Sequence, residues 1–276
     1  MASFKNDQAA GLRRLMAAPK PRIVSIIAAD HTQDQARTII NLGASIRSHG
    51  NDILIVHASL TSRESSYDIA KMPTLLDVSS NGISLESALK NTSHDLTIAR
   101  LVQKNQLAAP LDENKAAGLN HLLEEISSQY DVVLVDTTLN SSDLLPLKTL
   151  NENDILIQLT RAPESITSAY SLMKQICAQL GRRSFGIIVS DSTEKQALNV
   201  FKNISQVAQR FMQVELEYFG AIPTDEHLNR AAKLGRSVVD AFPLTPASQA
   251  FKQIALRLHS KASLGNPNQE LLSILN

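Results

Sequence analysis

The stretch IIAADHTQDQARTIINLG, residues 26–43, decides the fold. An apolar strand ends at Ala28 or Ala29, a polar loop follows, and a helical pattern begins by about Gln35. Strand–loop–helix units of this kind bind phosphate when the loop supplies glycines, a lysine and a hydroxyl group. This loop has no glycine and no lysine. The sequence therefore predicts the frame of a phosphate site without its chemistry.

Short apolar runs alternate with longer helical patterns along the rest of the chain. The predicted strands span 22–28, 52–57, 96–102, 131–136, 153–159, 185–190 and 215–221. The predicted helices span 33–49, 112–129, 165–180, 193–213, 225–234 and 246–261. This alternation predicts an α/β fold with a doubly wound, mostly parallel β-sheet flanked by helices. We expect one such domain over residues 21–262, preceded by an N-terminal helix and hinge at 1–20 and followed by a C-terminal tail at 263–276.

The composition argues against several classes of function. Lysine plus arginine and aspartate plus glutamate both number 27, so the formal net charge is zero. A neutral chain argues against direct binding to nucleic acid or to an anionic membrane. Cys177 is the only cysteine, which excludes a disulfide within the chain. The chain has neither a signal-peptide core nor an apolar run long enough to span a bilayer, so we expect a cytoplasmic protein.

Five stretches, in the right order, resemble the MinD/ParA superfamily of deviant Walker ATPases, and in particular its FlhG/FleN branch of flagellar-number regulators. The first stretch is similar to the DQAxxLR motif that precedes the ATPase domain in FlhG-type proteins, and the third contains the Walker B strand. The stretches are DQAAGLRRLM (7–16), TLLDVSSNGISLESAL (74–89), YDVVLVDTTLN (130–140), TRAPESITSAYSLMKQI (160–176) and the C-terminal part at 200–258. The resemblance covers nearly the whole chain and implies a MinD-like P-loop NTPase fold.

The resemblance also aligns the family's KGGVGKT loop with residues 30–36, where little of it is left. Asp30 and Gln35 replace the two lysines, Ala36 replaces the magnesium-binding threonine, and His31, Thr32 and Asp34 replace the glycines. At the end of the second strand, His57 begins the segment that replaces the family's DAD, so the acidic residue that orients the attacking water is missing. Asp136, on the Walker B strand, is all that remains of the catalytic set. Val189 and Ser190 stand where the family has the asparagine that reads the adenine.

These replacements predict that binding of ATP and Mg²⁺ is lost or very weak, and we expect no other cofactor. A P-loop holds phosphate through backbone N–H groups with glycine torsions and through the lysine charge. Because a hydrogen bond to a charged group contributes about 1.5–3 kcal/mol, losing two lysine contacts weakens binding about 100- to 10,000-fold. Asp30 and Asp34 add repulsion beside a triphosphate. We therefore expect no catalytic residues, and a pseudo-ATPase.

A metal site is an alternative use of the same region. His31, His57 and Asp136 have suitable residue types if the alignment brings them together. Loop histidines with no special role are commoner, so we expect no metal. We expect Asp136 to be retained because it caps a helix or holds a strand-end turn.

The segment 5–17 predicts an amphipathic helix that ends before Pro19 and Pro21. The simplest explanation is a structural one, in which this helix packs on its own domain. The resemblance instead implies a partner-binding helix, whose contact residues are Asp7, Gln8, Leu12 and Arg13. The implied partner is an FlhF-like SRP-type GTPase or another flagellar assembly or regulatory protein.

The resemblance further bears on assembly. In the family, the signature lysine reaches the phosphates of the opposite subunit, and Asp30 cannot do so. We therefore expect a monomer or a dimer that is independent of nucleotide. The tail at 268–276 is short and has no basic or aromatic anchor, so membrane association is unexpected or indirect.

The sequence thus predicts a non-hydrolysing MinD/FlhG-like regulatory protein that acts through protein contacts in flagellar assembly or placement. Two alternatives stay open. One is a MinD/ParA-like ATPase with residual or altered nucleotide binding, which would depend on Asp136. The other is a degenerate regulator of transcription or chromosome partition. The identity of the partner, the direction of regulation and the contents of the altered cleft are also open.

Overall fold

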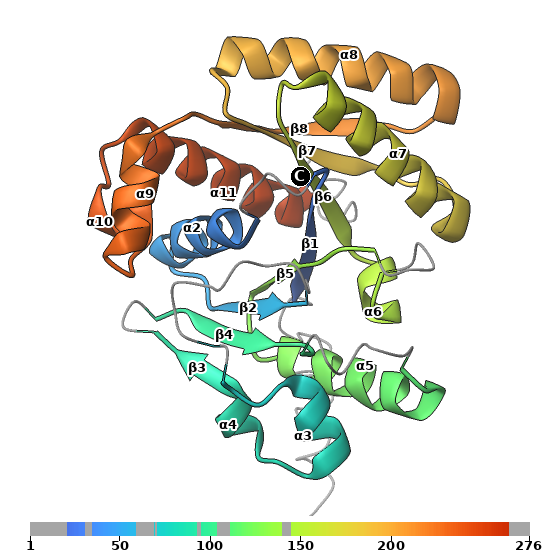
Figure 1. Ribbon diagram of the computed structural model, residues 1–276, viewed down its shortest axis with the longest axis vertical. Helices are drawn as coiled ribbons and strands as arrows, with labels where there is room; N and C mark the ends of the chain where they lie inside the picture. The colour runs from blue at the N-terminus through green and yellow to red at the C-terminus, as the bar shows by residue number, and fades with distance from the viewer. Residues whose placement is uncertain are drawn as a thin grey trace, which may run out of the picture.

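The computed structural model describes residues 21–30, 35–58, 69, 71–92, 95–103, 111–139 and 145–264, with side chains described to residue 259. Its centre is an eight-stranded sheet in the order β3-β4-β2-β5-β1-β6-β7-β8 (Figure 1). The strands are β1 (Arg22–Ala28), β2 (Ile53–His57), β3 (Leu89–Asn91), β4 (Thr97–Arg100), β5 (Val132–Asp136), β6 (Asp154–Leu159), β7 (Phe185–Ser190) and β8 (Leu216–Ile222). Neighbouring strands are parallel except β3 and β4, which pair antiparallel.

Helices cover both faces of this sheet. One face carries α3 (Leu75–Asn81), α4 (Leu85–Ala88), α5 (Glu113–Ser127), α6 (Lys148–Asn151), α7 (Pro163–Leu180) and α8 (Glu194–Met212). The other face carries α2 (Gln35–Ser48), α9 (Glu226–Lys233), α10 (Val238–Ala241) and α11 (Pro246–Leu264). The predicted doubly wound α/β fold is therefore confirmed.

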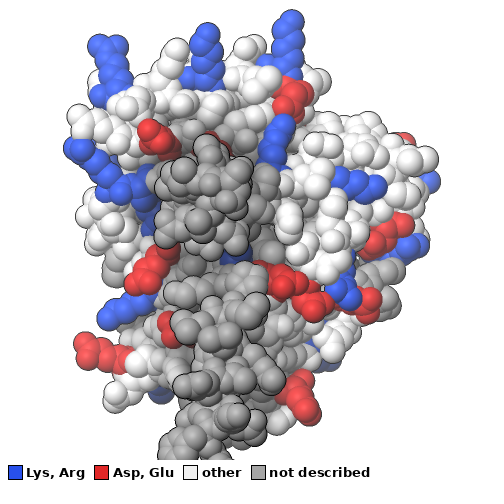
Figure 2. All heavy atoms as spheres, turned by 180° about the vertical axis from the view of Figure 1, so that it is seen from behind, with Lys and Arg blue, Asp and Glu red and all other residues white. Residues whose placement is uncertain are grey.

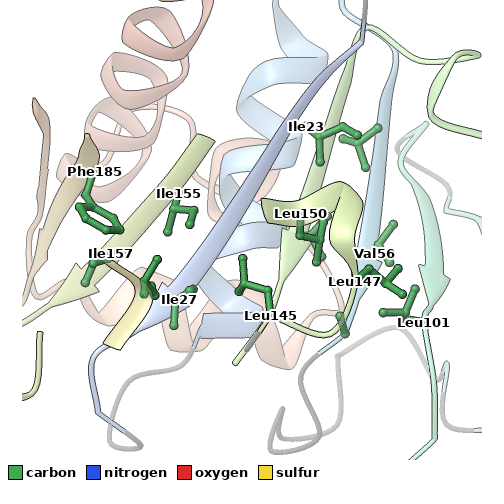
Figure 3. Close-up of a cluster of buried hydrophobic side chains, with 14 of the residues drawn as sticks. Ile23, Ile27, Val56, Leu101, Leu145, Leu147, Leu150, Ile155, Ile157 and Phe185 are labelled. Atoms are coloured by element: carbon green, nitrogen blue, oxygen red, sulfur yellow. The ribbon is translucent and has the colours of Figure 1, made fainter. Parts of the chain in front are cut away.

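Two separate hydrophobic clusters lie on the two faces of the sheet. In β1, Ile23 and Ile27 pack into one cluster, while Val24 and Ile26 pack into the other. Figure 3 shows part of the first cluster, which includes side chains of β1, β6 and β7 and Leu150 of α6. Because both faces are buried, the central strands have near-continuous apolar sequences rather than alternating ones.

Helix α2 lies closely against the sheet and is buried along most of its length. Gly43 allows this approach, because a Cβ atom at this position would lie 2.8 Å from the Cδ1 atom of Ile55 in β2. The fixed position of α2 determines where its first residue, Gln35, meets the carboxyl ends of β1 and β5.

From residue 22 onward, all of the predicted strands and helices of the α/β domain are present, with ends that shift by up to about three residues, as is usual for such boundaries. The sequence analysis missed β3 and the short helices α3, α4, α6 and α10. β3 has only three residues and no apolar run. Helix α3 did have a signal, since Thr74 and Asp77 form a capping box at its start and Gly82 ends it in the left-handed conformation.

Within the described part of the chain, no helix has the length and apolarity that crossing a bilayer requires. The predicted N-terminal helix, with Asp7, Gln8, Leu12 and Arg13, lies outside the described residues, as does the chain from residue 265 onward.

Candidate functional site

The candidate site lies at the carboxyl ends of β1 and β5, which are neighbours in the middle of the sheet. From β1 the chain crosses to β2 on one side, and from β5 it crosses to β6 on the other. Doubly wound sheets bind ligands at such a switch point. Helix α2 begins here, so its N-terminus and the ends of β1, β2 and β5 define the site.

Gln35, at the position aligned with the P-loop lysine, is turned into the sheet. Its Nε2 atom donates hydrogen bonds to the carbonyl oxygens of Ile26 and of Thr137, the latter at 3.0 Å. Its Oε1 atom accepts a hydrogen bond from the backbone N–H of Ala28 at 3.1 Å. The side chain is 8% exposed. An uncharged carboxamide therefore joins α2 to the ends of β1 and β5.

His57 and Asp136 form a buried pair beside this carboxamide. The Nδ1 atom of His57 lies 2.6 Å from Oδ2 of Asp136, and the backbone N–H of Ala58 donates to Oδ1 at 3.0 Å. The two side chains are 4% and 0% exposed. An ionised carboxylate buried this deeply requires such partners. Since the carboxylate accepts, Nδ1 carries the hydrogen, and Nε2 is buried with no partner among the described residues.

A further polar pair continues toward the far strands. The Nε2 atom of Gln158 in β6 donates to the hydroxyl oxygen of Ser190 in β7 at 2.9 Å, and both residues are buried. Val189 points into the hydrophobic cluster on the other face. Neither Val189 nor Ser190 has a carboxamide with which to read an adenine. The sequence analysis missed Gln158, although a glutamine within the apolar run DILIQL is a signal of a buried polar contact.

The remaining predicted residues of this region are placed as follows. Ala36 is 5% exposed in the first turn of α2, and Asp30 is half-buried two residues after the end of β1. His31 and Asp34 lie outside the described residues. No group of three metal-ligating side chains occurs where the chain is described. Of the three metal ligands considered, His57 and Asp136 are adjacent, but the carboxylate holds the imidazole.

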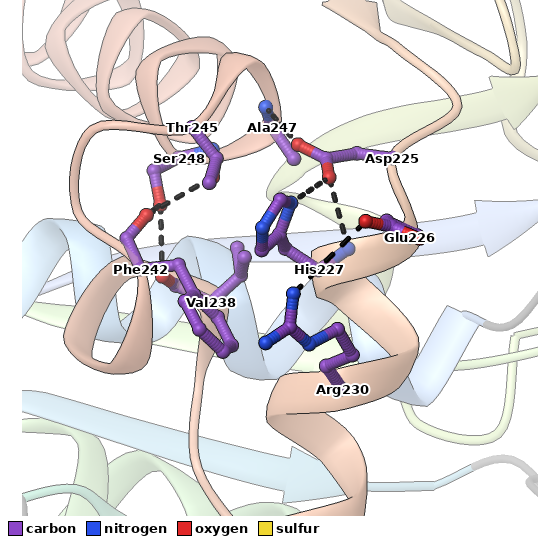
Figure 4. A network of polar contacts seen from close by, with 9 residues as sticks. All are labelled: Asp225, Glu226, His227, Arg230, Val238, Phe242, Thr245, Ala247 and Ser248. Atoms are coloured by element: carbon purple, nitrogen blue, oxygen red, sulfur yellow. Dashed lines mark hydrogen bonds and ion pairs between the residues drawn. The ribbon is translucent and has the colours of Figure 1, made fainter.

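A second polar network holds the C-terminal helices α9 and α11 together (Figure 4). Oδ1 of Asp225 accepts from the backbone N–H and the Nδ1 atom of His227 at 2.9 and 2.8 Å, and Oδ2 accepts from the N–H of Ala247 at 3.1 Å. Burial opposes the charged carboxyl, but these hydrogen bonds outweigh it and lower the pKa of Asp225. The imidazole of His227 packs edge-on against Phe242, and Arg230 lies over the same ring. Asp225 thus ties the start of α9 to the start of α11.

The comparisons with known proteins agree with this architecture. No protein-family model matches the chain. The antiactivator FleN of Pseudomonas aeruginosa is 28% identical over 235 residues, which cover 84% of this chain and 84% of FleN. An uncharacterized ATP-binding protein of Methanocaldococcus jannaschii is 26% identical over 145 residues, or 52% of each chain.

Solved structures show the same fold. MinD in the MinC:MinD cell division complex of Aquifex aeolicus aligns with a TM-score of 0.66 and 18% identity, covering 87% of this chain and 96% of that one. A ParA family ATPase from Chlorobium tepidum aligns with a TM-score of 0.64 and 18% identity, covering 87% and 100%. The resemblance found in the sequence is thereby confirmed: this chain is similar to FleN over most of both sequences and has the fold of the MinD and ParA ATPases.

Proposed function

We propose that the protein is a non-hydrolysing, FleN-like regulatory protein that acts through protein partners. Homology to FleN over most of both chains supports a regulatory role. The MinD/ParA fold supplies the scaffold. The loss of ATP hydrolysis is inferred from the side chains at the switch point.

Gln35 is the observation that carries this proposal. A phosphate-binding lysine at this position must point its ammonium group into the loop, whereas the carboxamide of Gln35 points into the backbone of β1 and β5. The side chain has no charge to offer, and exposing it would break its hydrogen bonds to Ala28, Ile26 and Thr137. Each costs about 0.5–1.5 kcal/mol net. This cost and the absence of a lysine charge both weaken the binding of phosphate.

Asp136 offers a second reason. One of its oxygens is engaged by His57 and the other by the N–H of Ala58. To coordinate Mg²⁺, the carboxylate would have to leave the imidazole, and leaving a buried hydrogen-bonding group without its partner costs about 1–3 kcal/mol. The retained acid therefore acts as a structural partner of His57 rather than as a metal ligand.

Nucleotide binding is the direct test. Titration of the full chain with a fluorescently labelled ATP analogue and Mg²⁺ should give no saturable binding, and phosphate release should equal that of buffer. The MinD of Pyrococcus horikoshii, which was solved with Mg-ADP, serves as the positive control. Tight Mg²⁺-ATP binding, or turnover that Asp136→Ala abolishes, would support the alternative of an altered ATPase and refute the proposal.

The proposed setting is the cytoplasm, in flagellar assembly or placement. The N-terminal segment, with Asp7, Gln8, Leu12 and Arg13, is the proposed contact with an FlhF-like GTPase. Pull-down of that GTPase should succeed with the full chain and fail after deletion of residues 1–18. Equal recovery of the GTPase by the full and the shortened chain would show that this segment is not the contact.

A transcription activator is the second candidate partner, because the relative FleN is named an antiactivator. The same pull-down with an activator as bait separates the two. Retention of the activator by both the full and the shortened chain would place its contact on the α/β domain.

A further inference from the structure

The two outer helices α7 and α8 carry an unbalanced charge in a chain whose net charge is zero. Between residues 163 and 214, which span both helices, there are six lysines and arginines but three acids, namely Glu164 in the first turn of α7, Asp191 before α8 and Glu194 at the start of α8. Lys and Arg side chains project from the end of the molecule where these helices lie (Figures 1 and 2). Positive charge is thus concentrated on one layer of the fold.

The exposed cations of this layer are Lys174, Arg182, Lys195, Lys202 and Arg210. None of them forms an ion pair with an acid in the described part of the chain, whereas Arg22 pairs with Asp154 at 2.7 Å and Arg47 with Asp52 at 2.7 Å. Glu194, at the start of α8, also contributes to the raised pKa of Tyr218, after the larger effect of burial.

Apolar side chains are interspersed with the cations on α8. Leu198 is 45% exposed and lies one turn from both Lys195 and Lys202, at i+3 and i−4, so the three share one side of the helix. At the other end of the helix, Phe211 is 66% exposed and the guanidinium of Arg210 lies over its ring. A surface that alternates cations with exposed apolar groups is suited to a partner that alternates acids with apolar groups.

We propose that the outer face of α7 and α8 binds an acidic, amphipathic segment of a protein partner. This inference rests on the proposed function, in which the protein acts through protein contacts, and it names the chemistry of one partner. The exposed leucine and phenylalanine favour a protein over nucleic acid, for which a broad basic footprint is expected. A lipid surface would need a larger outward apolar face than Leu198, Val207 and Phe211 provide, because the other apolar residues of α8, such as Ala197, Val200 and Ile204, are buried.

Fluorescence anisotropy tests the proposal with a short labelled peptide that has Glu and Leu at helical three- and four-residue spacing. The full chain should bind it, and binding should weaken between about 0.1 M and about 1 M salt, over which the screening length falls from about 10 Å to about 3 Å. The double variant Lys195→Glu/Lys202→Glu should weaken binding about tenfold or more. Leu198→Ser should also weaken it.

The matched control is Lys71→Glu/Lys233→Glu, which makes the same change in net charge at exposed residues away from α7 and α8. It should stay within about twofold of the wild type. Equal loss in both double variants, or no peptide binding by the wild type, would overturn the proposal. So would binding to duplex DNA or to phosphatidylglycerol vesicles that depends on Lys195 and Lys202 while peptide binding does not. ATP turnover together with normal peptide binding would overturn only the proposed function.

Discussion

Gln35→Ala removes the side chain that ties the first turn of α2 to β1 and β5. Three hydrogen bonds are lost, but the carbonyl of Ile26 keeps the N–H of Thr137 as a donor at 3.1 Å. The N–H of Ala28 and the carbonyl of Thr137 lose the partner that Gln35 provides. An unsatisfied buried group costs about 1–3 kcal/mol. We therefore expect the free energy of unfolding to fall by about 2–4 kcal/mol.

Urea unfolding at pH 7, followed by circular dichroism, measures this change, and the m-value should stay constant. Gln209→Ala is the matched control, since Gln209 is exposed on α8, and it should change stability by less than about 0.5 kcal/mol. Gln35→Glu should be worse than Gln35→Ala, because a carboxylate would face the carbonyl oxygens of Ile26 and Thr137. The loss of stability in Gln35→Glu should become smaller as the pH falls, because a protonated carboxyl group has an O–H that can donate to these carbonyl oxygens. A Gln35→Ala protein as stable as Gln209→Ala would refute the assigned role of the carboxamide.

Three further substitutions test other parts of the structure by the same unfolding assay. Asp136→Ala leaves the buried imidazole of His57 without its partner and should lower the free energy of unfolding by about 1–3 kcal/mol. A loss below about 0.5 kcal/mol would contradict the buried pair. Asp225→Asn should lower the free energy of unfolding most near neutral pH. A carboxyl with a lowered pKa stabilises the fold above its unfolded pKa of about 3.9, and this stabilisation is lost as the pH falls. A loss of stability that does not depend on pH would show that the charge of Asp225 does not stabilise the fold. Gly186→Ala puts a Cβ atom 2.1 Å from Cδ2 of Leu156 and should cost about 1–3 kcal/mol; a neutral result would mean that β6 and β7 repack freely.

Sequence periodicity was sufficient for the architecture because a parallel sheet buried on both faces leaves long apolar runs, as in β1 and β7. It was insufficient at the site. The missing lysine could be seen in the sequence, but the new role of Gln35 could not, because its partner Thr137 is 102 residues away. The neighbourhood of His57 and Asp136 followed from aligning the ends of two strands, whereas the hydrogen bond between them depends on the paired register of β2 and β5.

The same contacts explain how a site of this kind can lose its ligand without loss of the fold. A phosphate held at a switch point links α2, β1 and β5 through backbone groups, and its removal would leave those groups unsatisfied. Here the carboxamide of Gln35 satisfies the backbone of β1 and β5, and His57 satisfies the buried charge of Asp136. In the proposed function, the stability of the domain does not depend on nucleotide, because only a ligand that binds the native state adds stability. In the proposed function, the protein is controlled by the abundance and affinity of its partners, so the proposed binding face on α7 and α8 becomes the feature on which its activity depends.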